Sequence, residues 1–497
     1  MRCAPLSLIL LLGCGGSGTF GGPADDDDAT VGDDDDSTLG DDDDSTPGDD
    51  DDITEPPWDP DAGLDDLLAR TFRIDISRID LSLDFTPGAD TVLGDATLTF
   101  TMRPGQTRPL FHFTPFEDAG DVITGLELNG EVLDPSADLL VTTLPGSTQV
   151  VREIQRDVDP EAEHTLHVTF GMPNWWEDAD PGWLFTDVSD IAGDGNEYLF
   201  PTINAPDELA RHAIQVRVHS ERPYTLLGSG QVTVVPSQPG VQIWDVDTGR
   251  EVASYTVLLV AMPTNEVDVE ERVVNGVPMR VASIAPPADR EQAFDDAAWV
   301  LAVLEQDFGP LPMPALDVLL TTEYGGGMEY YGGTISDGWA LQHEIVHMYF
   351  GCSTVARTWR DSWWDEAINI WYLWPNSWSP LPFGWGSDIV SGRTPVMPAF
   401  DTRAYDEGAA VFEQVADRIG GRQALIDVLR VVRDDHTFDP FTTADLIRFI
   451  EAETGVDLSE EFATWVYGNQ ARAAAIPAAA HSSPTTTLRA TLRNAGP

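Results

Sequence analysis

Hydrophobic and polar residues alternate along the first half of the chain beyond residue 70. The alternating segments cover residues 72–77, 96–102, 164–170, 214–218 and 255–260, with Gly, Pro and Asp residues between them. A period of two places successive side chains on opposite faces of a strand, so one face of each segment can be buried. We therefore predict an N-terminal domain of antiparallel β sheet over residues 63–265.

The pattern changes near residue 265 to the spacing of three and four residues that is typical of amphipathic helices. Helices are predicted over residues 289–308, 337–350, 364–374, 404–419, 422–433, 444–454 and 458–467. Gly455 is placed to end one of these helices, and Thr442 or Thr443 can cap its start.

The two patterns together predict an α+β fold. A mainly helical domain over residues 266–475 follows the β domain, and a tail covers residues 476–497. Within the helical domain, residues 315–322 have the composition of a strand that leads into the glycine run at Gly325. A glycine-rich edge strand there can hold an extended peptide by main-chain hydrogen bonds.

The first 62 residues do not have the composition of a folded domain. Residues 1–14 have the form of a bacterial lipoprotein signal peptide, with an apolar run that ends at Cys14. We expect lipidation at Cys14, outside the cytoplasm, and Gly15 after the cysteine favours the outer membrane. In residues 15–62 a block of four aspartates recurs every eight residues. Its charge predicts a disordered stalk, and calcium binding by the repeats stays open.

The remainder of the chain is acidic as well. Without the sixteen aspartates of the repeats, a formal charge of −42 remains of the total of −58, and the basic residues are all arginine. This charge argues against nucleic acid and anionic membrane surfaces as partners, and it suits high ionic strength, where repulsion is screened. Membrane contact is expected only through the lipid, and nothing in the composition implies an oligomer.

One motif in the helical half carries chemistry. His343 and His347 are four residues apart with Glu344 between them, and Glu366 follows after eighteen intervening residues. Positions i and i+4 lie on one face of a helix, so both imidazoles can bind one metal ion. Glu366 is predicted as the third ligand, and Glu344 as the base that takes a proton from a metal-bound water. The prediction is one Zn²⁺ per chain in a hydrolase.

The alternative is a chance match on an amphipathic helix. The chain has only 9 histidines, which makes an accidental pair at this spacing rare. The helix also has local signals, since Ser336 or Asp337 can cap its start and Gly351 can end it.

Neighbouring residues narrow the kind of metal site. Phe350 and Ser353 stand where a metzincin would need Gly and His, so the third-ligand role is left to Glu366. Cys352 lies one turn beyond His347. We interpret it as a small core residue and not as a fourth ligand.

The stretch from His343 to Glu366, including Trp359-Arg360-Asp361, resembles the zinc motif of the aminopeptidase N family of gluzincin metallopeptidases, which includes leukotriene hydrolase. Residues 200–207 resemble a signature of that family's β domain. The resemblance extends from about residue 72 to residue 465. It implies a saddle-like β domain followed by a thermolysin-like zinc domain. The large helical C-terminal domain of other members is expected to be missing, which would leave the cleft open.

The resemblance also implies roles for individual residues. Residues 326–330 resemble the family's GxMEN motif, whose glutamate grips the free α-amine of the substrate, so Glu329 is expected to bind substrate together with Gly326 and Gly327. Tyr405 lies in a segment similar to the family's YxKG motif, whose tyrosine stabilises the oxyanion.

Some assignments stay open. Tyr372 and Tyr349 are alternatives to Tyr405, and Asp361 either orients a ligand histidine or has a capping or surface role. The chain departs from the family at Tyr330 and Asp365, where the family has asparagine. A second partner for the substrate amine is expected from the β domain, with four candidates: Asp187, Asp190, Asp194 and Glu197.

The sequence thus predicts a zinc metallopeptidase that acts on peptides and removes N-terminal residues. Two alternatives share the same motif. One is a surface protein that binds peptides with little or no turnover, and the other is a lipid epoxide hydrolase.

Overall fold

The computed structural model describes residues 60–89, 91–114, 122–144, 149–173, 182–186, 195–322, 324–375, 389–390, 393–397 and 402–468. Residues Asp59–Pro497 form one compact unit. The predictions for Cys14, for nearly all of the stalk and for the tail 476–497 lie outside the described residues. The predicted domain boundary near residue 265 stays a prediction.

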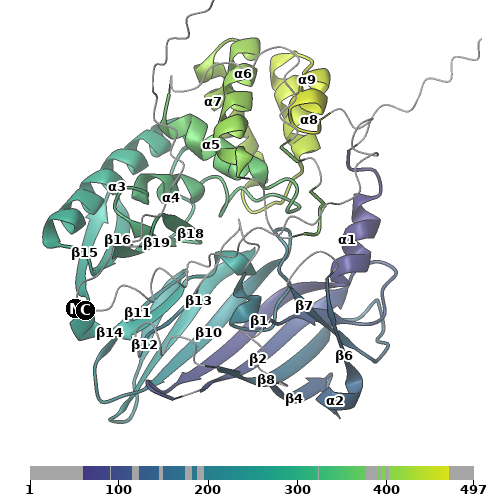
Figure 1. Cartoon of the computed structure of the whole chain (residues 1–497), viewed down its shortest axis with the longest axis vertical. Coiled ribbons are helices and arrows are strands. Elements are labelled where there is room, and N and C mark those ends of the chain that lie inside the picture. The colour runs from purple at the N-terminus through teal and green to yellow at the C-terminus, as the bar shows by residue number, and fades with distance from the viewer. Residues whose placement is uncertain are drawn as a thin grey trace, which may run out of the picture. The chain divides into compact units, whose positions relative to one another are not determined.

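An eight-stranded sheet forms most of the first half (Figure 1). Its strands, in spatial order, are β12 (Gln231–Val235), β13 (Val241–Ala253), β10 (Leu209–His219), β1 (Ile74–Phe85), β2 (Thr91–Met102), β8 (His164–Pro173), β4 (Ile123–Leu128) and β5 (Glu131–Leu133). Buried and more exposed residues alternate along β10, as the sequence pattern predicts. The pairing differs from the prediction at one point, because β1 and β10 run parallel while the other neighbours are antiparallel.

Two three-stranded sheets accompany the large sheet. One has the order β11 (Tyr224–Gly228), β14 (Leu259–Pro263), β9 (Leu184–Phe185), and the other β3 (Leu110–His112), β7 (Val150–Ile154), β6 (Leu139–Thr143). The predicted strand 255–260 is partly wrong, because Ser254–Thr256 form a 3-10 turn before β14 begins. Short helical turns complete this half: α2 (Pro135–Asp138), η1 (Asn196–Tyr198) and η3 (Thr264–Glu266).

A helix that the sequence pattern did not reveal precedes β1. Helix α1 (Leu64–Phe72) buries Leu64, Leu68 and Phe72 on one face. The spacing of these three residues is helical, but the segment lies directly beside the first alternating run. Arg73, with φ 51°, ends the helix and reverses the chain into β1.

The second half contains a mixed five-stranded sheet with helices packed against it (Figure 1). The strand order is β15 (Asp268–Val274), β16 (Val277–Ser283), β17 (Leu316–Thr321), β19 (Gly333–Asp337), β18 (Gly327–Tyr330). β16, β17 and β19 are parallel. The predicted glycine-rich edge strand is β18, which pairs with β19 and ends the sheet.

The helices follow the predicted order. They are α3 (Pro287–Phe308), α4 (Leu341–His347), α5 (Trp363–Leu373), α6 (Ala409–Ile419), α7 (Arg422–His436), α8 (Thr443–Thr454) and α9 (Ser459–Trp465). Thr442 and Asp445 form a capping box at the start of α8, and Gly455 ends that helix with φ 71°.

The prediction for the start of the motif helix α4 is wrong. Ser336 and Asp337 belong to β19 and do not cap the helix. The Asp337 carboxylate instead accepts hydrogen bonds from the Thr321 hydroxyl and from the backbone N–H groups of Tyr324 and Gly325. Asp337 therefore ties together the loop that precedes β18. Among the described residues, no helix is both long and apolar enough to cross a membrane.

Candidate active site

Three predicted ligand residues lie together at the junction of α4 and α5. The ligand atoms of His343, His347 and Glu366 all lie within 4.8 Å of one another. The two histidine Nε2 atoms are 2.9 Å apart, and Glu366 Oε2 lies 2.9 Å from that of His343 and 3.5 Å from that of His347. His347 and Glu366 are buried, and His343 is partly accessible.

This arrangement fits a zinc ion. Two imidazole nitrogens and one carboxylate oxygen are a donor set that zinc prefers in catalytic sites, with a fourth position left for water or substrate. Burial disfavours a charged His347, but the carboxylates of Glu329, Asp365 and Glu366 outweigh it and raise its pKa well above the ordinary value. The surroundings of this imidazole therefore favour positive charge, as a cation site requires.

The carboxylate behind His347 is Asp365, not Asp361. Asp365 Oδ1 lies 2.7 Å from His347 Nδ1. Asp361 accepts hydrogen bonds from the Thr358 hydroxyl and, at 2.9 Å, from the backbone N–H of Thr443. Asp361 thus has a structural role between α5 and α8, and the proposed contact with a ligand histidine is wrong.

Glu344 lies on the inner side of α4, where its side chain is 3 % exposed. The backbone of Gly327 in β18 packs directly against its carboxylate, so that a Cβ at position 327 would overlap it. Oxygen atoms of Glu344 and Glu329 and a nitrogen of His347 also lie within 4.8 Å of one another. The structure thus places the predicted base beside the cluster.

Glu329 lies in β18, opposite Thr334 of β19, and is 4 % exposed. The sequence separates it from His347 by eighteen positions, yet the carboxylate is close enough to raise the pKa of that imidazole. Gly326 lies just before β18, and its carbonyl accepts the N–H of Asp337 at 2.8 Å. The predicted amine-binding strand and the metal ligands therefore form one site.

Tyr405 reaches the cluster from a turn of π-helix, η4 (Ala404–Gly408), at the start of α6. Its hydroxyl donates to Glu366 Oε1 at 2.6 Å. Gly408 permits this approach, because a Cβ there would lie 2.7 Å from the Cβ of Ala367 on α5. The sequence prediction gave an uninterrupted helix from residue 404, and the π-helical turn was missed.

The two alternatives to Tyr405 point elsewhere. The Tyr372 hydroxyl donates to Asp307 Oδ2 at 2.8 Å, and the Tyr349 hydroxyl donates to the carbonyl of Gly309 at 3.0 Å. Both partners belong to the end of α3 and the residue after it. Of the three tyrosines, only Tyr405 is bonded to a ligand residue of the cluster.

Other residues considered from the sequence have different positions. Cys352 is buried behind His347, and burial raises the pKa of its thiol well above the ordinary value, which suits a core residue. Glu197 is buried in the β domain, where Gln149 and Asn204 donate to its Oε1 at 2.9 Å each. The other three candidates for binding the amine, Asp187, Asp190 and Asp194, lie outside the described residues.

Trp374, at the C-terminal end of α5, was not predicted as a site residue. Its ring stacks beside the imidazole of His343, with centroids 6.3 Å apart, and the side chain is 44 % exposed. Trp374 follows Glu366 by eight residues, or about two helical turns. This spacing in the sequence could have indicated that Trp374 lies near the site.

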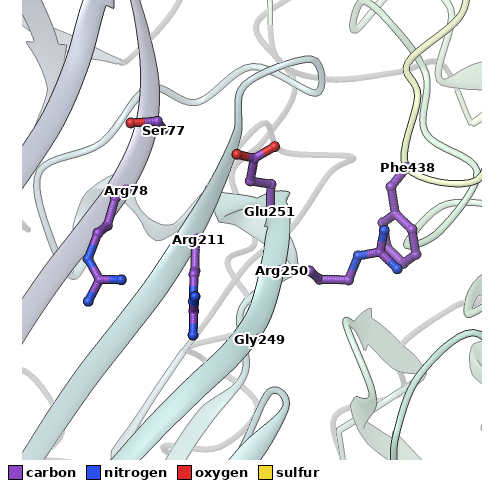
Figure 2. A pocket seen from close by; sticks show the side chains of 7 residues that line it. All are labelled: Ser77, Arg78, Arg211, Gly249, Arg250, Glu251 and Phe438. Carbon is purple, nitrogen blue, oxygen red and sulfur yellow. The ribbon is translucent and has the colours of Figure 1, made fainter. Parts of the chain in front are cut away.

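A pocket away from this site lies on the large sheet (Figure 2). Arg78 of β1 and Arg211 of β10 are register partners there, and Arg250 of β13 extends toward Phe438. Asp80 pairs with Arg78, and Asp247 pairs with Arg211. The guanidinium of Arg250 lies over the ring of Phe438, 3.2 Å from its centroid. The pocket therefore lies between the large sheet and the loop after α7. None of the predicted site residues lines it.

Comparison with known proteins finds relatives that are similar in sequence and solved structures that are similar in fold. The chain is 22 % identical over 455 residues to aminopeptidase N of Streptomyces lividans, covering 80 % of this chain and 50 % of the relative. It is 21 % identical over 376 residues to glutamyl aminopeptidase of Bos taurus, covering 64 % and 39 %. The chain spans about half the length of these curated relatives or less. No family model matches it.

Solved structures share the fold. An M1 zinc metallopeptidase from Deinococcus radiodurans, bound to a Tyr-Ser-Ala substrate, superposes with a TM-score of 0.60 at 18 % identity, covering 80 % of this chain and 94 % of that one. Aminopeptidase A of Legionella pneumophila, bound to aspartic acid, gives 0.62 at 16 % identity, covering 80 % and 50 %. The α+β prediction, a sheet domain followed by a helical domain, is confirmed.

Proposed function

We propose, from the premise that sequence and fold relate this chain to the aminopeptidase N family, that it is a zinc metallopeptidase that removes N-terminal residues from peptides. The observation that carries the proposal is the convergence of His343, His347 and Glu366 with the carboxylate of Glu344 beside them. Peptides are the substrates, and one zinc ion per chain is the cofactor.

His343, His347 and Glu366 would hold the ion. Zinc, when bound, polarises the scissile carbonyl and lowers the pKa of a water molecule. Glu344 accepts a proton from the attacking water as the new C–O bond forms, and it passes that proton to the amine when the C–N bond of the tetrahedral intermediate breaks. Glu344 thus carries this proton from the water to the amine.

Two further residues bind the substrate in this proposal. The Tyr405 hydroxyl, now on Glu366 Oε1, is placed to donate to the oxygen of the tetrahedral intermediate. Glu329 of β18 supplies a buried carboxylate for the protonated α-amine. β18 is the edge strand of its sheet, and an extended peptide is expected to add to the sheet at this edge.

Two measurements on purified protein test the proposal. The metal content should be about one zinc per chain and should fall in His347→Ala. Glu344→Gln keeps the shape of the side chain but removes the base, so it should retain zinc and lose at least about 10²-fold in kcat. Near-normal activity of Glu344→Gln would contradict the mechanism.

A substrate panel separates the alternatives. The panel contains amino-acyl amides, free peptides, N-acetylated peptides and a lipid epoxide. An aminopeptidase hydrolyses the first two classes, whereas a lipid epoxide hydrolase accepts only the last. Peptide binding without product, from protein that carries zinc, would indicate a binding protein instead.

The location of the protein in the cell is a separate proposal, which rests on the sequence alone. Cys14 is lipidated after removal of the signal peptide, and the aspartate repeats hold the folded part away from the membrane of the cell envelope, with the outer membrane favoured. Cys14→Ser should move the protein from the detergent phase to the aqueous phase. Equal partitioning of variant and parent would overturn the anchor.

A further inference from the structure

Asp365 contacts His347 at Nδ1, whereas His343 and Glu366 lie at the other ring nitrogen, Nε2. Its Oδ1 lies 2.7 Å from His347 Nδ1, and both side chains are buried. Asp365 immediately precedes the ligand Glu366 on α5. One helix therefore supplies a ligand and also a carboxylate that contacts a different ligand.

The contact determines which nitrogen of His347 faces the metal. A neutral imidazole carries one proton, and the nitrogen without it provides the lone pair for a metal. If Nδ1 donates its proton to Asp365, the lone pair is on Nε2. That atom lies 2.9 Å from His343 Nε2 and 3.5 Å from Glu366 Oε2. The tautomer that Asp365 selects is thus the one that the metal needs.

The Asp365 carboxylate is itself held in place. Asn369, one turn further along α5, has its Nδ2 3.3 Å from Asp365 Oδ1. On another side lies the backbone of Gly351, which has φ 127°, and a Cβ there would lie 2.5 Å from Asp365 Oδ2. Position 351 therefore accepts only glycine while Asp365 keeps this place.

Asn369 is the competing partner for the imidazole. Its Nδ2 lies 2.5 Å from His347 Nδ1, and with the amide turned over its oxygen could accept the same proton. The two candidates differ in charge. A carboxylate is the stronger acceptor, because a hydrogen bond to an ionised group is about twice as strong as one between neutral groups.

We propose that Asp365 is a positioning residue for the metal, which fixes the tautomer and the ring orientation of His347 and increases zinc affinity. The proposal rests on the zinc site of the proposed function. It assigns to Gly351 the role of leaving room for this carboxylate, and to Asn369 that of orienting it.

Zinc affinity, measured by competition with a chromophoric chelator, tests the proposal without reference to activity. Asp365→Asn should weaken zinc binding about 10-fold to 100-fold, the range typical of residues that orient a ligand. Gly351→Ala should weaken it as well, although residue 351 touches no metal. Asn369→Leu should weaken zinc binding less than Asp365→Asn does.

Asp361→Asn is the matched control, because it makes the same substitution in another buried aspartate of this region, one that contacts no ligand. It is expected to leave zinc affinity unchanged even if stability falls. The absorption spectrum of the Co²⁺-substituted protein gives a second readout, and it should change in Asp365→Asn but not in Asp361→Asn.

The outcomes separate this inference from the proposed function. Parent-like affinity of Asp365→Asn overturns the inference, and so does an equal loss in Asp361→Asn, which would indicate a general loss of structure. A larger loss in Asn369→Leu than in Asp365→Asn would assign the role to Asn369. If the parent and His347→Ala bind zinc equally weakly, the metal site of the proposed function fails instead.

Discussion

Gly327 of β18 lies so close to Glu344 of α4 that any side chain at position 327 would overlap the Glu344 carboxylate. The resemblance assigned Gly327 to substrate binding. The structure adds a second reason for glycine at this position, because the base can occupy its place beside the cluster only if residue 327 has no Cβ.

Gly327→Ala should therefore lower kcat by about 10-fold or more, since a displaced base loses part of the 10²-fold to 10⁴-fold that proton transfer contributes. Zinc content should not change, because residue 327 does not touch the three ligands. Steady-state kinetics and metal analysis measure the two effects. Gly338→Ala is the matched control, since a Cβ there meets only Leu320 Cδ1, at 4.0 Å, and no role in the site is assigned to Gly338. Equal losses in both variants would contradict the explanation.

Tyr405→Phe should lower kcat by about 10²-fold to 10³-fold, with little change in KM, because the hydroxyl acts on the oxyanion of the transition state. Its present bond to Glu366 Oε1 allows another outcome. If the hydroxyl only orients Glu366, zinc affinity would fall and excess zinc would restore the rate. Tyr372→Phe is the control, because that hydroxyl is bonded to Asp307.

The grouping of His343, His347 and Glu366 was predictable from sequence, whereas the carboxylate behind His347 was not. A spacing of four on a helix is a local property, so His343 and His347 necessarily share a face. The acceptor behind His347 depends on how α5 packs against α4, and this packing selects Asp365 over Asp361. The fold class followed from the change of hydrophobic period near residue 265.

Two other features were predicted wrongly, the turn before α6 and the start of α4, and both involve contacts between separate segments of the chain. Gly408 of the π-helical turn (Ala404–Gly408) packs closely on Ala367, about forty residues earlier, a contact that the hydrophobic pattern does not reveal. The start of α4 was predicted too early because Asp337 resembles an N-cap in sequence. In the structure its oxygens accept hydrogen bonds from Thr321, Tyr324 and Gly325, which come from the preceding strand and loop.

Two buried histidines of the β domain predict how stability changes with pH. Burial lowers the pKa of His112 to about 3 and that of His212 to about 4. In the unfolded chain both titrate near 6.5, so between pH 6.5 and 4 the unfolded state binds more protons than the folded state. The free energy of unfolding should be unaffected by these groups above about pH 7. It should fall below pH 6.5, by at most about 1.4 kcal/mol per pH unit for each histidine.

Urea denaturation between pH 7.5 and 4.5 measures this slope. His212→Gln should make the slope shallower, even if the variant is less stable at every pH. His167→Gln is the control, because His167 is exposed on the sheet beside Asp95. An unchanged slope in His212→Gln would show that burial of this histidine does not contribute to acid sensitivity.

In the proposed function, the requirement for a free N-terminus depends on Glu329. Its carboxylate is 4 % exposed in β18, near Glu344 and His347. A protonated α-amine gives this buried anion a charge-assisted hydrogen bond, whereas an acetylated terminus leaves it without that partner from the substrate. Losing one partner of a buried charge pair costs roughly 2–5 kcal/mol, so kcat/KM should fall by about 30-fold or more for N-acetylated peptides.

Mass spectrometry of products from paired free and N-acetylated peptides checks this requirement. The parent should trim free peptides stepwise from the N-terminus and leave the acetylated ones nearly intact. Glu329→Gln keeps the size of the side chain but removes its charge, so the preference for a free terminus should largely disappear while zinc content stays the same. Equal internal cleavage of both substrates by the parent would show an endopeptidase, and the role of Glu329 in binding the amine would then be wrong.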